Sequence, residues 1–270
     1  STSSVQLTVS GPLGESTTNR VDYIRVLPGI PPALPIYDAF NDSVSNSAVP
    51  TGWFCLSPGT SASHSRVDAG SLSYTGLQAS AGNSFGLGNK TDDYSLMFTS
   101  PTLGTNETIY FSTLLRFNYS TPSNMISGAL RLLDSADPYG SGIEVGFGAT
   151  NGESVMGFCL DNRNRVWNDT APIRTPASYT SVGVTYLIVG AYTRGTTATN
   201  GSVQLWVNPD SATFGTETPP AATLSTNTYQ SDSTWNRLDI ISAGSGSWPT
   251  NWQLDEVRIA TNWAGVVPVY

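Results

Sequence analysis

The sequence predicts an all-β fold in which two antiparallel sheets pack face to face behind an N-terminal β-hairpin. Three observations support this prediction. Apolar and polar residues alternate wherever a pattern is clear, clusters of Gly, Pro, Asn and Asp interrupt the alternation about every ten residues, and the helical period is almost absent. About a dozen short strands without intervening helices favour a β-sandwich over a parallel α/β sheet.

Residues 1–28 predict the hairpin, because two alternating segments flank a Gly- and Pro-rich turn. Residues 29–35 form a Pro-rich linker, and residues 36–270 form the sandwich. A lone hairpin is marginally stable in water, so we expect it either to pack on its own domain or to pair with a sheet edge, including that of another copy. The apolar positions that would support such assembly are Val5, Leu7, Val9, Ile24 and Val26.

The strands of the sandwich follow in order along the chain, and residues 109–117 are the clearest of them. The alternating apolar residues of this strand are Ile109, Phe111, Leu115 and Phe117. Further strands are expected at residues 72–75, 96–99, 129–133, 143–147, 155–160, 185–192, 203–207, 238–242 and 254–259.

Composition narrows the classes of function. The 12 Lys and Arg residues stand against 20 Asp and Glu residues, a net charge of −8, so the chain lacks the basic stripe of a nucleic-acid binder. No stretch approaches the length of an uninterrupted apolar membrane span. Asn-x-Ser/Thr sequons support an extracellular location, as expected for a secreted or cell-surface protein, and they begin at Asn41, Asn89, Asn106, Asn118, Asn168 and Asn200.

Several segments resemble a concanavalin A-like (laminin-G-like) sandwich domain of bacterial secreted and surface proteins. They are residues 37–40, 70–74, 110–117 and, most specifically, 252–259 with the 261–268 segment that follows. The hairpin is similar to the last strands of a PKD-type domain, through Leu7-Thr8-Val9 and residues 22–26. The resemblance implies a jelly-roll fold, which carries lectins, carbohydrate-binding modules, glycan hydrolases and lyases, and adhesive modules.

Catalytic motifs known from this fold are not matched. Its hydrolases carry two glutamates in a Glu-x-Asp-x-x-Glu strand, and the nearest segment here has Arg237 and Ser242 at the two glutamate positions. Its lyases require a histidine, and the single histidine, His64, lies in a Ser-rich segment where a loop role is expected. The sequence therefore predicts a protein that is not an enzyme, and no nucleotide-binding glycine pattern is found.

Binding of a polysaccharide or other glycan is better supported, because sugar rings stack on aromatic side chains and sugar hydroxyls bond to amides and charged groups. The candidates for such a site are Trp248, Trp252, Trp167, Tyr139, Asn164 and Arg165. The alternative is that an aromatic residue at a strand end plugs the core. We assign Trp206 and Trp263 to packing.

Two acidic residues predict a metal site. Related sandwiches often hold a structural Ca²⁺ where the first and last strands meet, and the resemblance implies that Asp38 and Asp255 could supply oxygen ligands there. The alternative is that these carboxylates cap turns by accepting backbone N–H bonds.

Cys55 and Cys159 each lie among apolar and aromatic residues. This setting suits either a buried disulfide or two core thiols, and we favour the disulfide.

Three hypotheses of function follow. The first is a non-catalytic, extracellular glycan-binding module. The second is a structural subunit of an extracellular filament or adhesive layer, in which the hairpin donates strands to a neighbouring copy. A polysaccharide-degrading enzyme is the third and least favoured.

Overall fold

The computed structural model describes most of the chain, which divides into two compact units, Ser1–Pro31 and Pro32–Tyr270. The described residues are 2–11, 14–25, 31–43, 45, 47–55, 65–88, 92–118, 127–133, 143–148, 157–161, 173–175, 180–197, 200–229, 234–243 and 252–269. None of the helices in these ranges has the length and hydropathy of a membrane span.

The first unit is the predicted hairpin. Strands β1 (Thr2–Gly11) and β2 (Gly14–Arg25) pair antiparallel, with a register shift between Ser3 and Val5. The predicted assembly positions Val5, Leu7, Val9 and Ile24 lie in these strands, and Val26 lies outside the described residues. The similarity of the hairpin to a PKD-type domain stays a prediction.

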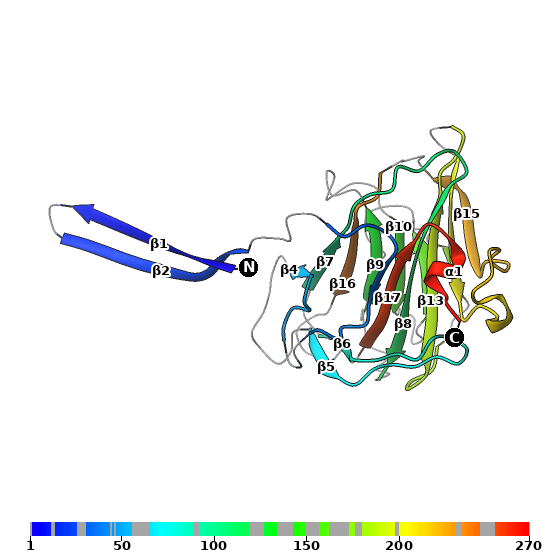
Figure 1. Ribbon diagram of the computed structural model, residues 1–270, viewed down its shortest axis with the longest axis horizontal. Helices are drawn as coiled ribbons and strands as arrows, with labels where there is room; N and C mark the ends of the chain where they lie inside the picture. The colour runs from blue at the N-terminus through cyan, green and yellow to red at the C-terminus, as the bar shows by residue number, and fades with distance from the viewer. Residues whose placement is uncertain are drawn as a thin grey trace. The chain divides into compact units, whose positions relative to one another are not determined.

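The second unit is the predicted sandwich of two antiparallel sheets (Figure 1). The first, called the β16 sheet, has the order β12 (Ile173–Arg174), β11 (Gly157–Asp161), β10 (Ile143–Gly148), β9 (Ser127–Leu133), β16 (Arg237–Ala243), β7 (Asp92–Met97) and β4 (Phe54–Cys55). The second, the β17 sheet, has the order β15 (Leu224–Tyr229), β14 (Gly201–Val207), β13 (Thr185–Thr193), β8 (Thr108–Phe117), β17 (Trp252–Ala260), β6 (Asn83–Leu87) and β5 (Arg66–Ala69), and β3 (Ile36–Asp38) also pairs with β17.

The main core lies between the two sheets, and alternation along the strands places it there. Tyr94 and Ile240 reach it from the β16 sheet, while Phe111, Leu115 and Leu254 reach it from the β17 sheet, and all five are buried. The face of β8 predicted to be apolar is therefore the face that lines this core.

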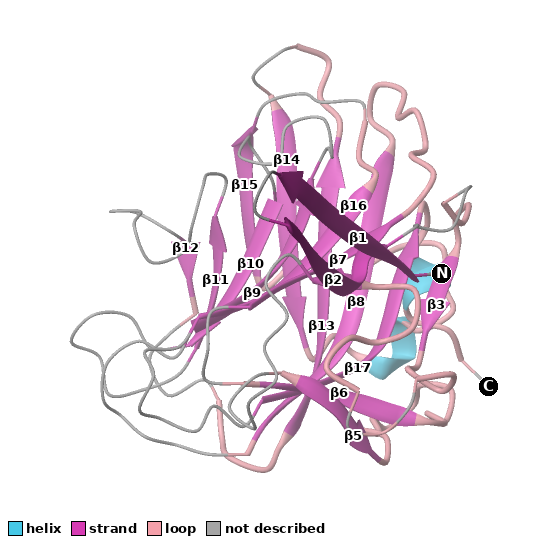
Figure 2. Cartoon of the chain, turned by 90° about the vertical axis from the view of Figure 1, so that its left-hand side faces the viewer, coloured by secondary structure: helices cyan, strands magenta, loops and turns pink. Residues whose placement is uncertain are grey.

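A second apolar layer covers the outer face of the β17 sheet. There the short helix α1 (Trp263–Val266) and Phe214, which follows the 3₁₀ turn η1 (Ser211–Thr213), pack with residues of β8, β13 and β14. Trp206 and Trp263 lie at its centre, with ring centroids 5.1 Å apart, as expected for packing residues. Figure 2 shows α1 beside β17. Because of this layer, both faces of β8 and β13 are buried, which strict alternation would not require.

Residues 72–75, predicted as a strand, are instead an irregular segment of this second layer. Gly70 and Gly76 bound the segment with positive φ angles of 92° and 91°, a backbone conformation that interrupts a strand. The N–H of Leu72 donates to the carboxylate of Asp255, at 2.7 Å, rather than to a neighbouring strand.

The predicted disulfide between Cys55 and Cys159 is wrong. Cys55 lies in β4 and Cys159 in β11, which are five inter-strand steps apart in the β16 sheet. At about 4.8 Å a step, the two residues are separated by roughly 20 Å or more, and a disulfide requires Cα atoms within about 7 Å. An apolar sequence around each cysteine does not reveal whether the two strands are neighbours in the sheet.

Candidate functional site

A cluster of charged side chains lies on the outer face of the β16 sheet. Leu238 and Ile240 of β16 face the core, so Arg237 and Asp239 lie on the opposite face. The register places Asp239 directly opposite a residue of β7 on one side and of β9 on the other. We call this set the Asp–Arg cluster, and it comprises Asp93, Ser95, Arg131, Arg237 and Asp239.

Asp239 is the centre of the Asp–Arg cluster and is fully buried. Its Oδ1 accepts a hydrogen bond from the Ser95 hydroxyl at 2.6 Å, and its Oδ2 accepts one from Nη2 of Arg237 at 2.8 Å. Arg237 is itself only 7% exposed. A buried ion pair with a further hydrogen bond holds the carboxylate in one orientation.

Asp93 is the second carboxyl group of the cluster. Burial, followed by the negative charge of Asp239, raises the pKa of Asp93 to about 6, although Arg237 and Arg131 act in the opposite direction. The Oδ1 atom of Asp93 and the Nε atom of Arg237 are buried and have no hydrogen-bond partner among the described residues. Such unsatisfied polar atoms cost about 1–3 kcal/mol each and are rare, so the two atoms call for a partner such as a bound water or a ligand.

The chemistry of this arrangement follows from the two different carboxyl groups. Asp239 is held by a guanidinium and a hydroxyl, whereas Asp93 exchanges a proton near neutral pH. A carboxyl group with a pKa near 6 is present in both its protonated and its ionised form near that pH, so Asp93 can either donate or accept a hydrogen bond. The cluster can therefore recognise groups that both donate and accept hydrogen bonds.

Sequence reasoning did not find this cluster, although a signal for it exists. Arg237 and Asp239 alternate with Leu238 and Ile240, so the sequence shows two charges on the face opposite the core. That segment was compared only with the hydrolase spacing. Its partner Asp93 lies more than a hundred positions away, and only strand pairing brings the two together.

The predicted glycan-binding residue Trp252 does not form a surface platform. It is the first residue of β17, is 3% exposed, and packs edge to face on Phe117 with centroids 4.3 Å apart. The core-plug alternative is therefore correct for Trp252, because its neighbour in the sheet is the aromatic end of β8. The other candidates lie outside the described residues, and they are Trp248, Trp167, Tyr139, Asn164 and Arg165.

Asp38 and Asp255 lie on paired strands, as expected, because Asp38 of β3 is opposite Val257 of β17. Their oxygens are nevertheless engaged by N–H donors. Asp38 accepts from the backbone of Phe40 at 2.8 Å and from Nε1 of Trp53 at 2.7 Å, and Asp255 accepts from Leu72 and Glu256 backbones at 2.7 and 2.8 Å.

These two carboxylates do not fit a calcium site. Calcium requires about six to eight oxygen ligands, and no group of three or more His, Cys, Asp or Glu residues suited to a metal occurs in the described ranges. Burial raises the pKa of Asp255 to about 8 and also raises that of Asp38. The geometry matches the alternative, in which the carboxylates cap turns.

Comparison with known proteins identifies the fold. No family model matches the sequence, and no curated protein matches it. The CBM2 module of the evolved Dit of Lactobacillus casei BL23 phage J-1 has a TM-score of 0.50 and 10% identity, covering 84% of this chain and 95% of that chain. A β-glucanase of Bacillus licheniformis has a TM-score of 0.46 and 9% identity, and the match covers 84% of this chain and 97% of that chain. An endo-1,3-β-glucanase of Streptomyces sioyaensis has a TM-score of 0.43 and 11% identity, and the match covers 80% of this chain and 98% of that chain.

The similarity to the CBM2 module and the topology of the two sheets confirm the predicted fold class, a jelly-roll sandwich of two antiparallel sheets. The expectation that the protein is not an enzyme is also corrected, because it rested on one missing motif, and this fold by itself does not decide between binding and catalysis. That expectation rested on two glutamates within one strand, whereas strand pairing brings Asp93 and Asp239 together from two strands. The missing motif therefore does not exclude catalysis.

Proposed function

We propose that this protein recognises a glycan at the outer face of the β16 sheet, with the Asp–Arg cluster as the polar centre of the site. The observation that carries the proposal is a pair of buried polar atoms, Oδ1 of Asp93 and Nε of Arg237, for which the described part of the chain offers no hydrogen-bond partner. A sugar hydroxyl is both a donor and an acceptor, so one hydroxyl can donate to the carboxyl and its neighbour can accept from the guanidinium. The Asn-x-Ser/Thr sequons support an extracellular setting, and the similarity in fold to a CBM2 module supports glycan binding.

The test is a binding and cleavage screen on the same samples. Polysaccharides to include are a β-1,3-glucan, a mixed-linkage β-glucan, chitin and an acidic polysaccharide, because the fold does not identify the sugar. Affinity electrophoresis measures binding, and release of reducing ends measures cleavage. We expect binding to at least one neutral polysaccharide. Absence of both binding and cleavage across the panel would contradict the proposal.

A pair of matched variants locates the site. Asp93→Asn keeps the size of the side chain and removes its titratable oxygen, so we expect affinity to fall about fivefold to twentyfold, the loss of one or two hydrogen bonds. Asp42→Asn is the control, because Asp42 is exposed and its carboxylate lies outside the cluster. If both variants bind with the affinity of the unsubstituted protein, the Asp–Arg cluster is not part of the binding site.

Assembly through the hairpin is a second candidate function. In the described residues β1 and β2 pair only with each other, so each strand leaves one row of backbone N–H and C=O groups unused. A two-stranded ribbon of this kind is marginal alone and gains most from adding a strand of another copy. Deletion of residues 1–28 tests the idea by electron microscopy and sedimentation. Assembly requires that the full chain forms oligomers or filaments and that the deletion abolishes them.

A further inference from the structure

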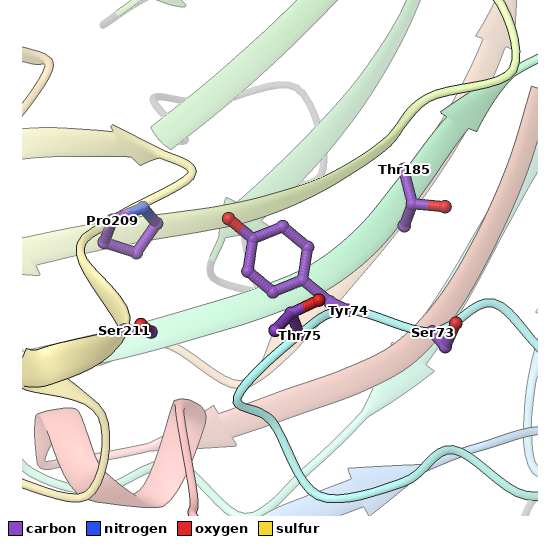
Figure 3. Close-up of a pocket in the computed structure, with 6 residues that line it drawn as sticks. All are labelled: Ser73, Tyr74, Thr75, Thr185, Pro209 and Ser211. Atoms are coloured by element: carbon purple, nitrogen blue, oxygen red, sulfur yellow. The ribbon is translucent and has the colours of Figure 1, made fainter.

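A pocket of about 370 Å³ lies on the outer side of the β17 sheet, away from the face that carries the Asp–Arg cluster. Thr185, the first residue of β13, forms one wall, and the loop before η1 forms another (Figure 3). The ring of Tyr74 stands between Pro209 and Thr185. The lining residues are Ser73, Tyr74, Thr75, Thr185, Pro209 and Ser211.

Tyr74, which also lines the pocket, is held in place by the turn in which it lies and by packing. The N–H of Leu77 donates to the carbonyl of Tyr74 at 3.3 Å, and Gly76 takes a φ of 91°, as a type II turn requires. Gly76 also lies so near η1 that a Cβ there would be 3.1 Å from Cβ of Ser211. The Tyr74 ring itself packs on Phe214, with centroids 6.3 Å apart.

The opposite wall is equally fixed. Asn208 bonds to Leu187 of β13 through both its backbone N–H, at 2.8 Å, and its side-chain oxygen, at 2.9 Å. Asp210 then caps η1 by accepting from the N–H of Ala212 at 3.0 Å. The pocket is therefore preformed, and a ligand would order little of the chain on binding.

The chemistry of the lining selects a class of ligand. None of the six lining residues is charged, four carry aliphatic hydroxyls, and Tyr74 and Pro209 offer apolar ring surfaces. Burial raises the pKa of Tyr74, so its phenol stays neutral at physiological pH. A ligand that fits must be neutral, with hydroxyls at its edge and an apolar face for the tyrosine ring, which is the surface of a sugar ring.

We propose that this pocket is a second carbohydrate subsite, which holds one ring of a neutral glycan against the face of Tyr74. The inference rests on the proposed function, but it concerns the other sheet. A protein with sites on both sheets binds two chains, or two parts of one chain, and so gains avidity for polymeric glycans over short oligosaccharides.

The experiment measures the binding of cellohexaose and laminarihexaose by calorimetry. We expect Tyr74→Ala to weaken binding about tenfold, because the stacking surface is lost, and Tyr74→Phe to retain most of the affinity. Thr185→Val, which preserves shape and removes one hydroxyl, should weaken binding about twofold to fivefold. The control is Val182→Ala, because Val182 is 48% exposed and outside the pocket.

A second measurement does not depend on the folding of a variant. Either hexasaccharide should protect Tyr74 of the unsubstituted protein from iodination, as read by peptide mass spectrometry. Loss of affinity in Asp93→Asn with unchanged affinity in Tyr74→Ala and Thr185→Val, and no protection of Tyr74, would overturn the subsite and leave the proposed function standing. The reverse pattern would retain the subsite and overturn the role of the Asp–Arg cluster. Failure of both hexasaccharides to bind would overturn the subsite.

Discussion

Asp239 has an environment unlike that of an ordinary surface acid. Its carboxylate lies in a sheet yet is fully buried, and it balances the charge of Arg237. A buried pair contributes little net stability, because desolvation offsets the attraction, but removal of one partner leaves a charge buried without compensation. The pair is therefore a constraint on which side chains the site tolerates.

Asp239→Asn should lower the free energy of unfolding by about 3 kcal/mol, since Arg237 then stays buried and unpaired. Urea denaturation measures the change. The matched control is Asp68→Asn, because Asp68 forms an exposed pair with Arg66 at 3.4 Å and its loss should cost less than about 1 kcal/mol. Equal effects of the two substitutions would contradict the difference in burial on which this expectation depends.

The raised pKa values of Asp93 and Asp255 predict how stability depends on pH. Both groups start near 3.8 in the unfolded chain and rise to about 6 and about 8 in the folded protein, so the folded state binds more protons between these limits. The free energy of unfolding should therefore fall as pH rises, by up to about 1.4 kcal/mol per pH unit for each group. The fall should be steepest from about pH 4 to 6 and should continue on Asp255 alone to about pH 8.

Urea denaturation at several pH values checks this profile. In Asp93→Asn, the free energy of unfolding should depend less on pH below about pH 6. In Asp255→Asn, it should depend less on pH above about pH 6. A free energy of unfolding that rises with pH in this window would show that the bonds donated by Leu72 and Glu256 outweigh the burial of Asp255.

At the scale of the element, β8 and β13 show how two strands fit each other. Gly190 of β13 is directly opposite Phe111 of β8, and the Phe111 ring covers the glycine. A Cβ on Gly190 would overlap Cζ of Phe111, which is 1% exposed and has no room to move. The glycine therefore makes space for an aromatic ring of the core.

Gly190→Ala should lower the free energy of unfolding by about 2 kcal/mol, because the core becomes overpacked. The m value, which is the slope of the free energy of unfolding against urea concentration, should stay unchanged. Ser202→Ala on the neighbouring strand β14 is the control and should change stability by less than about 0.5 kcal/mol. A neutral effect of Gly190→Ala would mean that the Phe111 ring has an alternative position.

The elements also show what could be predicted from the sequence. Local alternation predicted β8 and the face that Phe111 and Leu115 present to the core, because that pattern depends only on neighbouring residues. The prediction of a strand at residues 72–75 is wrong, because an alternating pattern does not reveal that the N–H of Leu72 donates a hydrogen bond to Asp255, far along the chain. Trp252 was misplaced for the same reason, since its burial depends on Phe117 of another strand.

At the scale of the whole molecule, the chain divides into two compact units, Ser1–Pro31 and Pro32–Tyr270. Both sheets and both apolar layers belong to the second unit. Deletion of residues 1–31 should therefore leave the thermal midpoint of the sandwich within a few degrees of that of the full chain, because both sheets and both apolar layers are retained. Circular dichroism measures the midpoint, and a large decrease would show that the hairpin stabilises the sandwich.

The fold class was predictable at this scale, whereas the candidate site was not. Alternation and turn residues suffice to indicate two sheets, but the order of strands decides which side chains meet. Asp93 and Asp239 become neighbours only because β7 pairs with β16, and Cys55 and Cys159 are kept apart by the same order. Sequence positions alone leave many such orders open.

The position of β17 within its sheet has a consequence for folding during synthesis. This late strand lies in the middle of its sheet and supplies partners for β3, β6 and β8, all of which leave the ribosome well before it. Until β17 emerges, β6 and β8 present open edges that invite association with other chains. Folding of the nascent protein is therefore expected to be late and slow, and premature termination before residue 252 should yield aggregates rather than a smaller folded product.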